Sequence, residues 1–425
     1  MAEAARRILI ELKFMMALKV DFTRIAHAKK KRRHIGGHLE GITFSLLVLW
    51  CFLPVLMSLF DFMGGVTGRF PIMTNEILER EGLTLGQINY SMALRIYRML
   101  FRRLGFATSG FAMICLLLKR SILIKQLSFK QSPWFCFLGI LLIWSGVCTI
   151  RSDDLRNAIL GGSYMNDGLL SYLFYAGVFL CASFIRKEKY RLWILRLYSA
   201  VVCYLAVIMV VQELTDNAFL LYCFPARRAA VFNQFNHFGY VLCMAVHAST
   251  GLYLYDRCAG TAVRIVYLLA FSFLVYSLLM NETFGSYLAT LFAFPVIYLF
   301  YTRRGGMLNW KSSLPFLLFL AISVIDCFGL TPGPYRLLND FSQLAKDIFS
   351  IGIGAEEADK AGTGRFILWK DTVHRIAQRP IFGFGPNGFW GENAITGGNA
   401  PHNEYLQVAE CCFRLFVVSD FVFDR

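Results

Sequence analysis

Charged residues are scarce in this sequence. Asp, Glu, Lys and Arg make up 17% of its 425 residues, whereas 56% of the residues are hydrophobic and 16% are aromatic. The mean hydropathy is +0.51. A soluble domain of this length has a more polar composition. The sequence therefore excludes an ordinary soluble protein and predicts an all-α polytopic integral membrane protein.

Acidic residues are the scarcer of the two charges. The chain has 28 Asp and Glu against 43 Lys and Arg, which gives a formal net charge of +15. Such an excess can indicate nucleic-acid binding, but here the basic residues lie in short clusters between apolar runs. That placement is typical of membrane topology signals and of contact with lipid headgroups. We therefore predict membrane lipid as a partner, and no nucleic acid.

Cysteine motifs are lacking as well. The 12 cysteines form no CxxC pair and no Cys/His cluster with the spacing of metal ligands, and most of them lie inside apolar runs. Cysteines in such runs are usually small buried hydrophobic residues. The sequence accordingly predicts neither a disulfide nor a metal site.

A signal-peptide cleavage site is also missing. The first apolar run, residues 42–60, starts late, and no cluster of small residues follows it. The basic cluster Lys29–Arg33 directly precedes this run, and basic residues are retained on the cytoplasmic side of a membrane. We therefore predict a basic cytoplasmic segment over residues 1–40 and an uncleaved first span.

Nine apolar windows lie within residues 41–329, which form the predicted multi-helix transmembrane domain. Each is close to the roughly 20 residues that cross a bilayer, and we predict nine to ten spans. The windows are 42–60, 104–118, 133–150, 169–185, 192–212, 230–255, 262–280, 284–301 and 312–329. With the N-terminus inside, basic residues concentrate in the inner loops and acidic residues in the outer loops.

The first outer loop is the exception to this charge pattern, because it ends with Arg95, Arg98, Arg102 and Arg103. We predict an interfacial amphipathic helix over Tyr90–Leu104, with its arginines on lipid headgroups. The alternative is that the window 104–118 is too short to span, in which case every later loop changes side.

The long polar segment 330–404 follows the ninth window and is predicted to lie outside the cytoplasm. Thr331–Pro334 ends the ninth helix, because two prolines remove backbone donors. Short helices are predicted over Phe341–Phe349 and Arg365–Gln378, the second one lying on the membrane surface with its apolar side down. The segment is too aromatic for a disordered linker, and we predict a folded cap over a site.

Several motifs follow one another in the second half of the chain. They are Arg228 before Asn233–Tyr240, then Asn281–Gly285, then Gly364, Arg365, Trp369, Pro380 and Gly383–Pro386, and finally His402, Asn403, Glu404, Tyr405 and Leu406. This ordered set resembles the signature of the O-antigen ligase and O-antigen polymerase superfamily of bacterial envelope glycosyltransferases. In the first half, the resemblance rests on hydropathy alone.

The resemblance implies a metal-independent and cofactor-independent glycan transfer at the outer face of the cytoplasmic (inner) membrane. The donor is a glycan on a polyprenyl diphosphate carrier, and the acceptor is a hydroxyl of a glycan, a lipid or a cell-wall polymer. Segment 330–404 is then the catalytic loop. Ligase and polymerase roles stay open, because both use the same donor.

Three residues are candidates for this chemistry. His402 is the candidate base, since a histidine titrates near working pH. Arg365 and Arg228 are the candidates for binding the diphosphate, because guanidinium groups bind phosphate oxygens in a bidentate way. Asn236 and His237, at a helix start, are second-tier candidates.

Each candidate also has a simpler structural interpretation. An arginine at a membrane boundary can be a headgroup anchor, and Arg365 can simply start a helix. His402 and the second-tier residue Asn403 can belong to a helix cap, with Asn403 as N-cap. We interpret Glu282 as an acid that is favoured at a helix N-terminus.

The end of the sequence departs from the family pattern. The family continues with a glycine-containing apolar helix, whereas residues 411–425 are short, lack glycine and contain Arg414 and Asp420. We interpret residues 405–425 as an incomplete final helix and expect impaired transfer by the chain as written.

A second function class is a non-catalytic transporter, or an exporter of lipid-linked oligosaccharide. Such proteins tend to have charged residues within their spans and internal repeats. Here Asp326 is almost the only acid within an apolar run, and we detect no repeat. An outer catalytic loop explains the sequence better.

Overall fold

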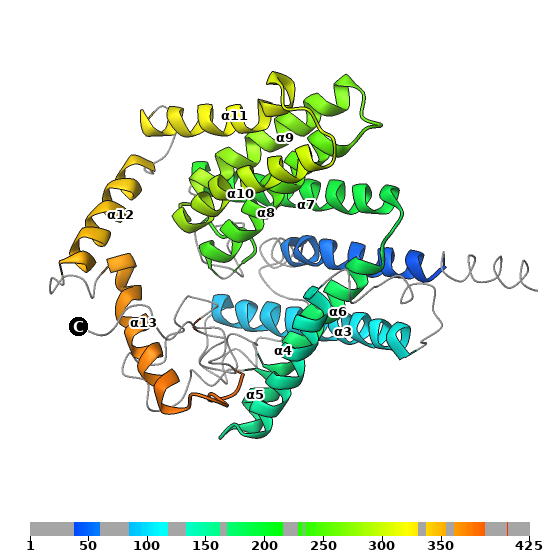
Figure 1. The fold of residues 1–425 in the computed structure, drawn as a ribbon, viewed down its shortest axis with the longest axis vertical. Helices are drawn as coiled ribbons and strands as arrows, with labels where there is room; N and C mark the ends of the chain where they lie inside the picture. Colours follow the sequence, from blue (N-terminus) through cyan, green and yellow to red (C-terminus); the bar gives the residue numbers. More distant parts are fainter. Residues whose placement is uncertain are drawn as a thin grey trace, which may run out of the picture.

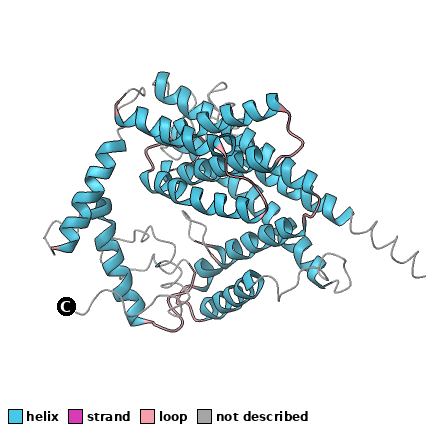
Figure 2. Ribbon diagram, turned by 45° about the horizontal axis from the view of Figure 1, so that its top comes forward, coloured by secondary structure: helices cyan, strands magenta, loops and turns pink. Residues whose placement is uncertain are grey.

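The computed structural model describes residues 38–59, 85–117, 133–161, 168–215, 228–232, 234–329, 337–353, 361–386 and 406. All regular elements in these residues are helices (Figure 2). They are His38–Leu59, α3 (Leu85–Leu117), α4 (Pro133–Ile150), α5 (Leu155–Leu160), α6 (Leu169–Phe184), α7 (Glu188–Thr215), α8 (Phe235–Tyr255), α9 (Thr261–Met280), α10 (Phe284–Arg303), α11 (Trp310–Cys327), α12 (Leu337–Gly352) and α13 (Ala361–Gln378). The predicted all-α class is confirmed.

The nine apolar windows all coincide with helices, but the first outer loop was interpreted wrongly. No separate interfacial helix covers Tyr90–Leu104. The helix α3 runs without a break for 33 residues through this segment and into the second window. No proline interrupts the sequence there, so nothing removes a backbone donor and ends the helix.

Six described helices are long and apolar enough to cross a membrane: His38–Leu59, Arg98–Leu116 within α3, Glu188–Leu214 within α7, α9, α10 and α11. The helices Phe135–Ile150 and Leu169–Phe184 are apolar but shorter. The helix α8 belongs to neither group. It packs against α7, α9 and α10 and has buried polar residues such as Ser249 and Thr250. The molecule is a multi-pass membrane protein whose central helix is shielded by its neighbours.

Apolar clusters hold the described helices together, among them a larger and a smaller one. The larger one lies between α7, α8, α9, α10 and α11, and its fully buried members include Phe238, Leu274, Phe294 and Phe319. The smaller one joins His38–Leu59, α3 and α6, where Cys115 and Cys181 are buried. These two cysteines act as small core residues, as the sequence predicted.

The helices α12 and α13 form an arm that crosses one end of the bundle instead of running with the spans (Figure 1). The backbone N–H of Leu337 donates to Asp326 Oδ2 on α11 (2.9 Å), which fixes the start of α12. The backbone N–H of Gly362 donates to Asp347 Oδ2 (2.9 Å), which joins α13 to α12. Both short helices predicted for the polar segment are therefore present.

The far end of the arm packs on α4 and α5. The ring of Phe382 stacks on Trp144 with centroids 5.6 Å apart, and Arg379 forms a 2.9 Å ion pair with Asp153. Gly385 has a φ of 86°, and a Cβ atom there would lie 2.7 Å from Ser152 Cβ. Only glycine fits this turn without strain, so the Gly383–Pro386 segment is a tight packing turn.

Candidate functional site

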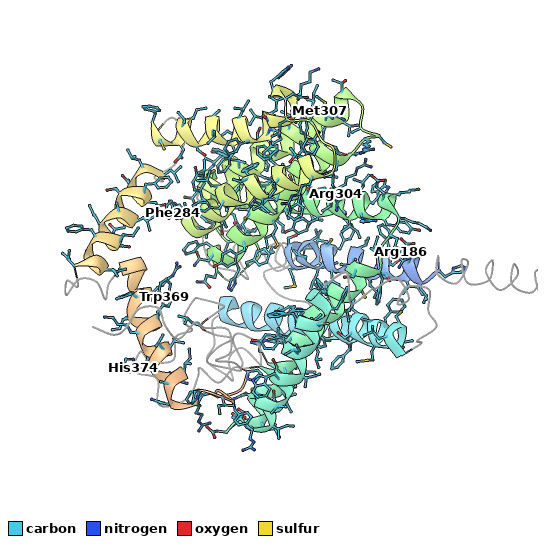
Figure 3. The ribbon with its side chains drawn as sticks, viewed as in Figure 1. Arg186, Phe284, Arg304, Met307, Trp369 and His374 are labelled. Atoms are coloured by element: carbon cyan, nitrogen blue, oxygen red, sulfur yellow. The ribbon has the colours of Figure 1, made fainter. Side chains whose placement is uncertain are left out.

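The candidate residues fall at different places in the structure. Arg228, Asn236 and His237 lie at the start of α8, and Arg365 lies near the start of α13. Figure 3 shows Phe284 at the neighbouring start of α10, and Trp369 and His374 along α13. His402 and Asn403 lie outside the described residues, as do Lys29–Arg33, Thr331–Pro334 and, apart from Leu406, the predicted final helix 405–425.

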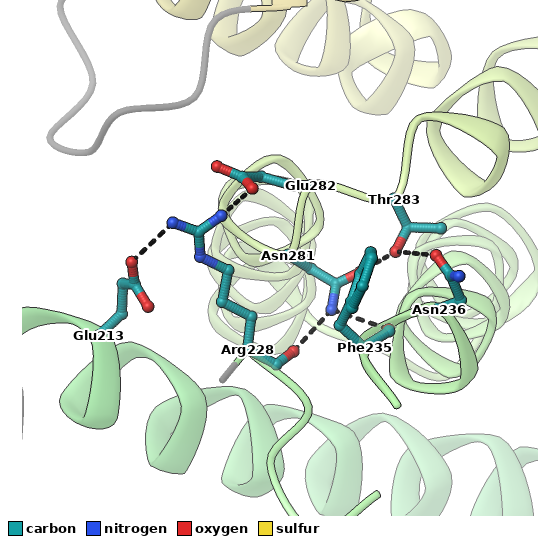
Figure 4. A network of polar contacts seen from close by, with 7 residues as sticks. All are labelled: Glu213, Arg228, Phe235, Asn236, Asn281, Glu282 and Thr283. Carbon is teal, nitrogen blue, oxygen red and sulfur yellow. Dashed lines mark hydrogen bonds and ion pairs between the residues drawn. The ribbon is translucent and has the colours of Figure 1, made fainter. Parts of the chain in front are cut away.

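The side chain of Arg228 is clamped between two carboxylates (Figure 4). Its Nη2 lies 2.8 Å from Glu213 Oε1 at the end of α7, and its Nη1 forms an ion pair with Glu282. The side chains of Arg228, Glu213 and Glu282 are 17%, 15% and 30% exposed. The Nε atom of Arg228 is buried and has no hydrogen-bond partner in the described part of the chain. This group of three residues, here called the Arg228 cluster, has one positive and two negative charges.

The backbone around the Arg228 cluster is strained. Arg228, Ala230 and Glu282 have φ values of 60°, 49° and 59°, and no other described non-glycine residue has a positive φ. A left-handed conformation costs such a residue on the order of 1–3 kcal/mol. Residues in this conformation are concentrated at binding and catalytic sites, so the cluster is the strongest candidate site in the described part of the chain.

Asn281 holds this strained backbone in place. Its buried Nδ2 donates to the backbone oxygens of Arg228 (2.7 Å) and Phe235 (3.0 Å). Thr283 Oγ1 donates to Asn281 Oδ1 (2.5 Å) and lies 3.5 Å from Asn236 Oδ1. Through this contact with Thr283, Asn236 in the first turn of α8 helps to orient the turn before α10.

The remaining second-tier residue, His237, is exposed on the first turn of α8, where its backbone N–H donates to the oxygen of Gln234 (3.2 Å). Gly239 lies two residues further on, and a Cβ atom there would lie 2.6 Å from Asn281 Oδ1. A glycine at this position therefore lets α8 approach the Asn281 turn.

Glu282 lies directly before the N-cap of α10, at a helix N-terminus as interpreted from the sequence, but it also has a partner that the sequence did not indicate. The N-cap of α10 is Thr283, the first turn of α10 has no acid, and the Glu282 carboxylate pairs with Arg228. Sequence reasoning also missed Glu213 and Asn281 as members of the site. The available signal was weak: Glu213 and Glu282 are acids that follow apolar runs and end at the same side of the bundle.

Arg365 differs from Arg228 because it is uncommitted. It is half-buried on α13, and it makes no hydrogen bond or ion pair within the described residues. Gly362 and Gly364, in the first turn of α13, have φ values of 60° and 81°, a backbone conformation that glycine adopts without strain. Among the described residues, no side chain or backbone group occupies this guanidinium.

Two more arginines on the arm were not predicted as functional. The guanidinium of Arg375 lies 4.6 Å from the ring centroid of Phe384, and that of Arg379 lies 4.7 Å from the same centroid. Arg151 lies 5.1 Å from the ring centroid of Phe382. Stacking of this kind stabilises a cation on an aromatic face, and we assign these contacts to the anchoring of the arm.

The opposite end of the bundle has a buried polar group of its own. Asp256 pairs with Arg196 and accepts a 2.7 Å hydrogen bond from Tyr267 Oη. Burial alone raises the pKa of Asp256, but the hydrogen bonds from Arg196 and Tyr267 outweigh this effect, and the pKa lies below its usual value. The carboxylate stays charged, and we assign it a structural role.

Comparison with known proteins gives one match. Residues 269–409 match the family model described as O-antigen ligase. No curated protein and no solved structure matches the chain. The matched segment contains Asn281, Glu282 and Arg365, whereas Arg228 and Glu213 precede it.

Proposed function

Because the chain belongs to the O-antigen ligase superfamily through residues 269–409, we propose that it transfers a glycan from a polyprenyl diphosphate carrier to an acceptor hydroxyl. The reaction takes place at the outer face of the cytoplasmic membrane. The observation that carries this proposal is that the matched segment includes the arm and its uncommitted Arg365. A half-buried guanidinium that has no polar partner among the described residues, beside a membrane-spanning bundle, suits the diphosphate of a lipid headgroup.

The transfer is a substitution at the anomeric carbon of the donor sugar. The acceptor oxygen forms a bond to this carbon while the bond between the carbon and the diphosphate oxygen breaks. The bonding electrons leave with the polyprenyl diphosphate, and His402 takes the proton of the acceptor hydroxyl. A base of this kind contributes about 10²–10⁴-fold.

Arg365 and Arg228 stabilise the leaving group. Negative charge grows on the diphosphate as the bond breaks, and guanidinium groups held in place lower the energy of that charge. Both residues belong to the same end of the bundle: Phe341 on α12 contacts Phe284, two residues after Glu282, with ring centroids 5.2 Å apart. Arg365 binds directly, whereas Arg228 first has to leave its carboxylates.

The transporter or exporter alternative rests mainly on Asp326, the acid within an apolar run, and the structure gives this residue another role. Asp326 is buried, and its Oδ2 accepts the hydrogen bond from Leu337 N that starts α12. This acid therefore holds the arm on the bundle. Its role in the structure supports a fixed cap over a site better than a polar path through the spans.

The test is the profile of lipid-linked and surface glycans in cells that lack the gene. The cells are complemented with the parent, with His402→Ala or with Arg365→Gln. We expect the parent, although impaired, to restore part of the surface glycan, and both variants to restore none and to leave lipid-linked glycan accumulated. A change in glycan length indicates a polymerase, and a change in attachment indicates a ligase. Full rescue by both variants would exclude the proposed transfer.

A further inference from the structure

Arg228 cannot receive an anionic ligand in the arrangement that the structure shows. Its Nη2 and Nη1 are paired with Glu213 and Glu282, and its Nε is buried. The two carboxylates outweigh the single guanidinium, so an approaching diphosphate meets a net negative charge. A donor that uses Arg228 therefore has to displace a carboxylate.

The two glutamates differ in how easily they leave. The side chain of Glu282 is 30% exposed, twice the 15% of Glu213, so Glu282 reaches water by a smaller movement. Glu282 also has the left-handed backbone, with a φ of 59°, and strain of this kind is found at switch and binding sites. Glu282 is therefore the carboxylate that an anionic ligand displaces more easily from Arg228, and Glu213 is the one that stays paired.

Replacing the Glu282 carboxylate on Arg228 by a ligand needs no movement of a helix. Asn281 donates to the backbone oxygens of Arg228 and Phe235, which locks the turn before α10 against the segment before α8. The backbones of Arg228 and Glu282 thus stay in register while the Glu282 side chain rotates. Only one carboxylate has to move for Arg228 Nη1 to become available.

We propose that Glu282 is a latch on Arg228, an inference that rests on the function proposed above. Its carboxylate holds Nη1 before the donor binds, and the diphosphate of the lipid-linked donor then takes its place. Both contacts are charge-assisted hydrogen bonds, but a diphosphate carries more negative charge than one carboxylate. An uncharged headgroup does not compete with Glu282, so the latch selects diphosphate donors.

The test is equilibrium binding of polyprenyl diphosphate to the full chain in lipid nanodiscs, with inorganic pyrophosphate as a second probe. Glu282→Gln keeps the size of the side chain and removes its charge. We expect this variant to bind polyprenyl diphosphate about tenfold more tightly, since no carboxylate competes for Arg228. A purely structural role of Glu282 predicts weaker binding instead.

Matched variants separate the possible causes. Asp153→Asn removes a carboxylate from the ion pair with Arg379 at the far end of the arm, and its binding should equal that of the parent. Glu213→Gln removes the same charge from the same guanidinium, and we expect a smaller gain than for Glu282→Gln. Equal gains from both variants contradict Glu282 as the exchanging member.

The failure of the latch and the failure of the proposed function give different results. If Arg228→Gln weakens binding while Glu282→Gln leaves it unchanged or weaker, the latch is wrong and the role of Arg228 stands. If Arg228→Gln binds like the parent, Arg228 does not bind the donor, and both ideas fail for this residue.

The pyrophosphate probe tests which part of the ligand competes with Glu282. The latch predicts that Glu282→Gln tightens the binding of pyrophosphate as well as that of the lipid. If Glu282→Gln changes the binding of polyprenyl diphosphate but not that of pyrophosphate, the substitution acts on the contact with the prenyl chain, and this result contradicts the latch. If Glu282→Gln does not fold, Glu282→Asp, which withdraws the charge by one methylene, should still tighten binding; weaker or unchanged binding overturns the proposal.

Discussion

At the scale of single residues, Asn281 joins two segments that are far apart in the sequence, the segment before α8 and the turn before α10. Its amide bonds two backbone oxygens near the start of α8, and its own oxygen accepts from Thr283. The side chain is fully buried, so its amide makes these hydrogen bonds out of contact with water. The strained backbone of Arg228 depends on this one amide.

The first prediction concerns the variant Asn281→Ala. It leaves two part-buried backbone oxygens without this donor, and each such group costs about 1–3 kcal/mol where water does not replace the donor. We expect the free energy of unfolding to fall by about 2–4 kcal/mol, measured by thermal or denaturant unfolding in detergent. The matched control is Asn157→Ala, because Asn157 bonds Asp154 at an exposed site. A loss no larger than that of the control contradicts the role of Asn281.

The second prediction is the pH dependence that Asp256 contributes. Its pKa in the folded state lies below the usual value, so the folded protein holds this proton less tightly than the unfolded chain does. The stabilisation is present in full above the unfolded pKa of about 4. It is lost as the pH falls through the lower, folded pKa.

The variant Asp256→Asn tests this sign. Arg196 is 33% exposed, which screens part of the interaction, and we expect the variant to be less stable than the parent by about 2 kcal/mol at pH 7. The measurement is the unfolding midpoint of both proteins between pH 7 and pH 3. The difference should narrow below about pH 4; a difference that grows on acidification contradicts the assignment.

The chemical types at the site were predictable from the sequence, but the pairings were not. Arginine suits a diphosphate wherever it lies, so Arg228 and Arg365 could be named from their chemistry and their motifs. The partners of Arg228 lie 15 residues before it and 54 residues after it, and only the packing of α7, α9 and α10 brings them together. No local sequence pattern indicates a pairing between residues so far apart in the chain.

At the scale of single elements, α12 is the most strongly amphipathic helix of the arm. Its apolar side chains Leu338, Phe341, Leu344, Ile348 and Phe349 are exposed, Ile348 by 62% and Phe349 by 68%. Asp326 fixes the start of α12 to the last turn of the span α11. A helix that begins at the end of a span, with its apolar side uncovered, suits the membrane interface.

The third prediction is that this side of α12 contacts lipid. A photoreactive benzoylphenylalanine at Ile348 should crosslink to acyl chains in nanodiscs, because the apolar side is buried in the headgroup region. The same probe at Gln343, which bonds Asp347 on the polar side, should give little lipid crosslinking. Equal crosslinking at both positions contradicts an interfacial α12.

Helix positions could be predicted because a span requires a long apolar run, and such runs are visible without any knowledge of packing. The prediction for α3 failed because its arginines indicated an interface, whereas the backbone continued without interruption. In α13, the residues Asp371, Thr372 and Arg375 are buried while Trp369 and Val373 are exposed. The positions of the apolar residues in the sequence do not predict which side of α13 is buried, because that depends on the elements that the arm packs against.

At the scale of the whole molecule, the two ends of the bundle have different characters. One end has the Arg228 cluster, three strained residues and the arm. The other has the compact group of Asp256, Arg196 and Tyr267. The first end combines this strain with Arg365, which has no polar partner among the described residues, and we therefore propose that the reaction takes place there.

The central claim is that this end binds the diphosphate of a lipid-linked glycan and that Arg365 does so directly. The most direct measurement is the rate at which the purified full chain releases polyprenyl diphosphate from a lipid-linked glycan donor in the presence of acceptor. We predict that Arg365→Gln lowers this rate about 100-fold, as expected for a lost contact to the developing charge. The matched control is Arg379→Gln. Arg379 is an exposed arginine at the far end of the arm, away from the site, and the rate of this variant should stay within about threefold of that of the parent. Release by Arg365→Gln at the rate of the parent would contradict the account.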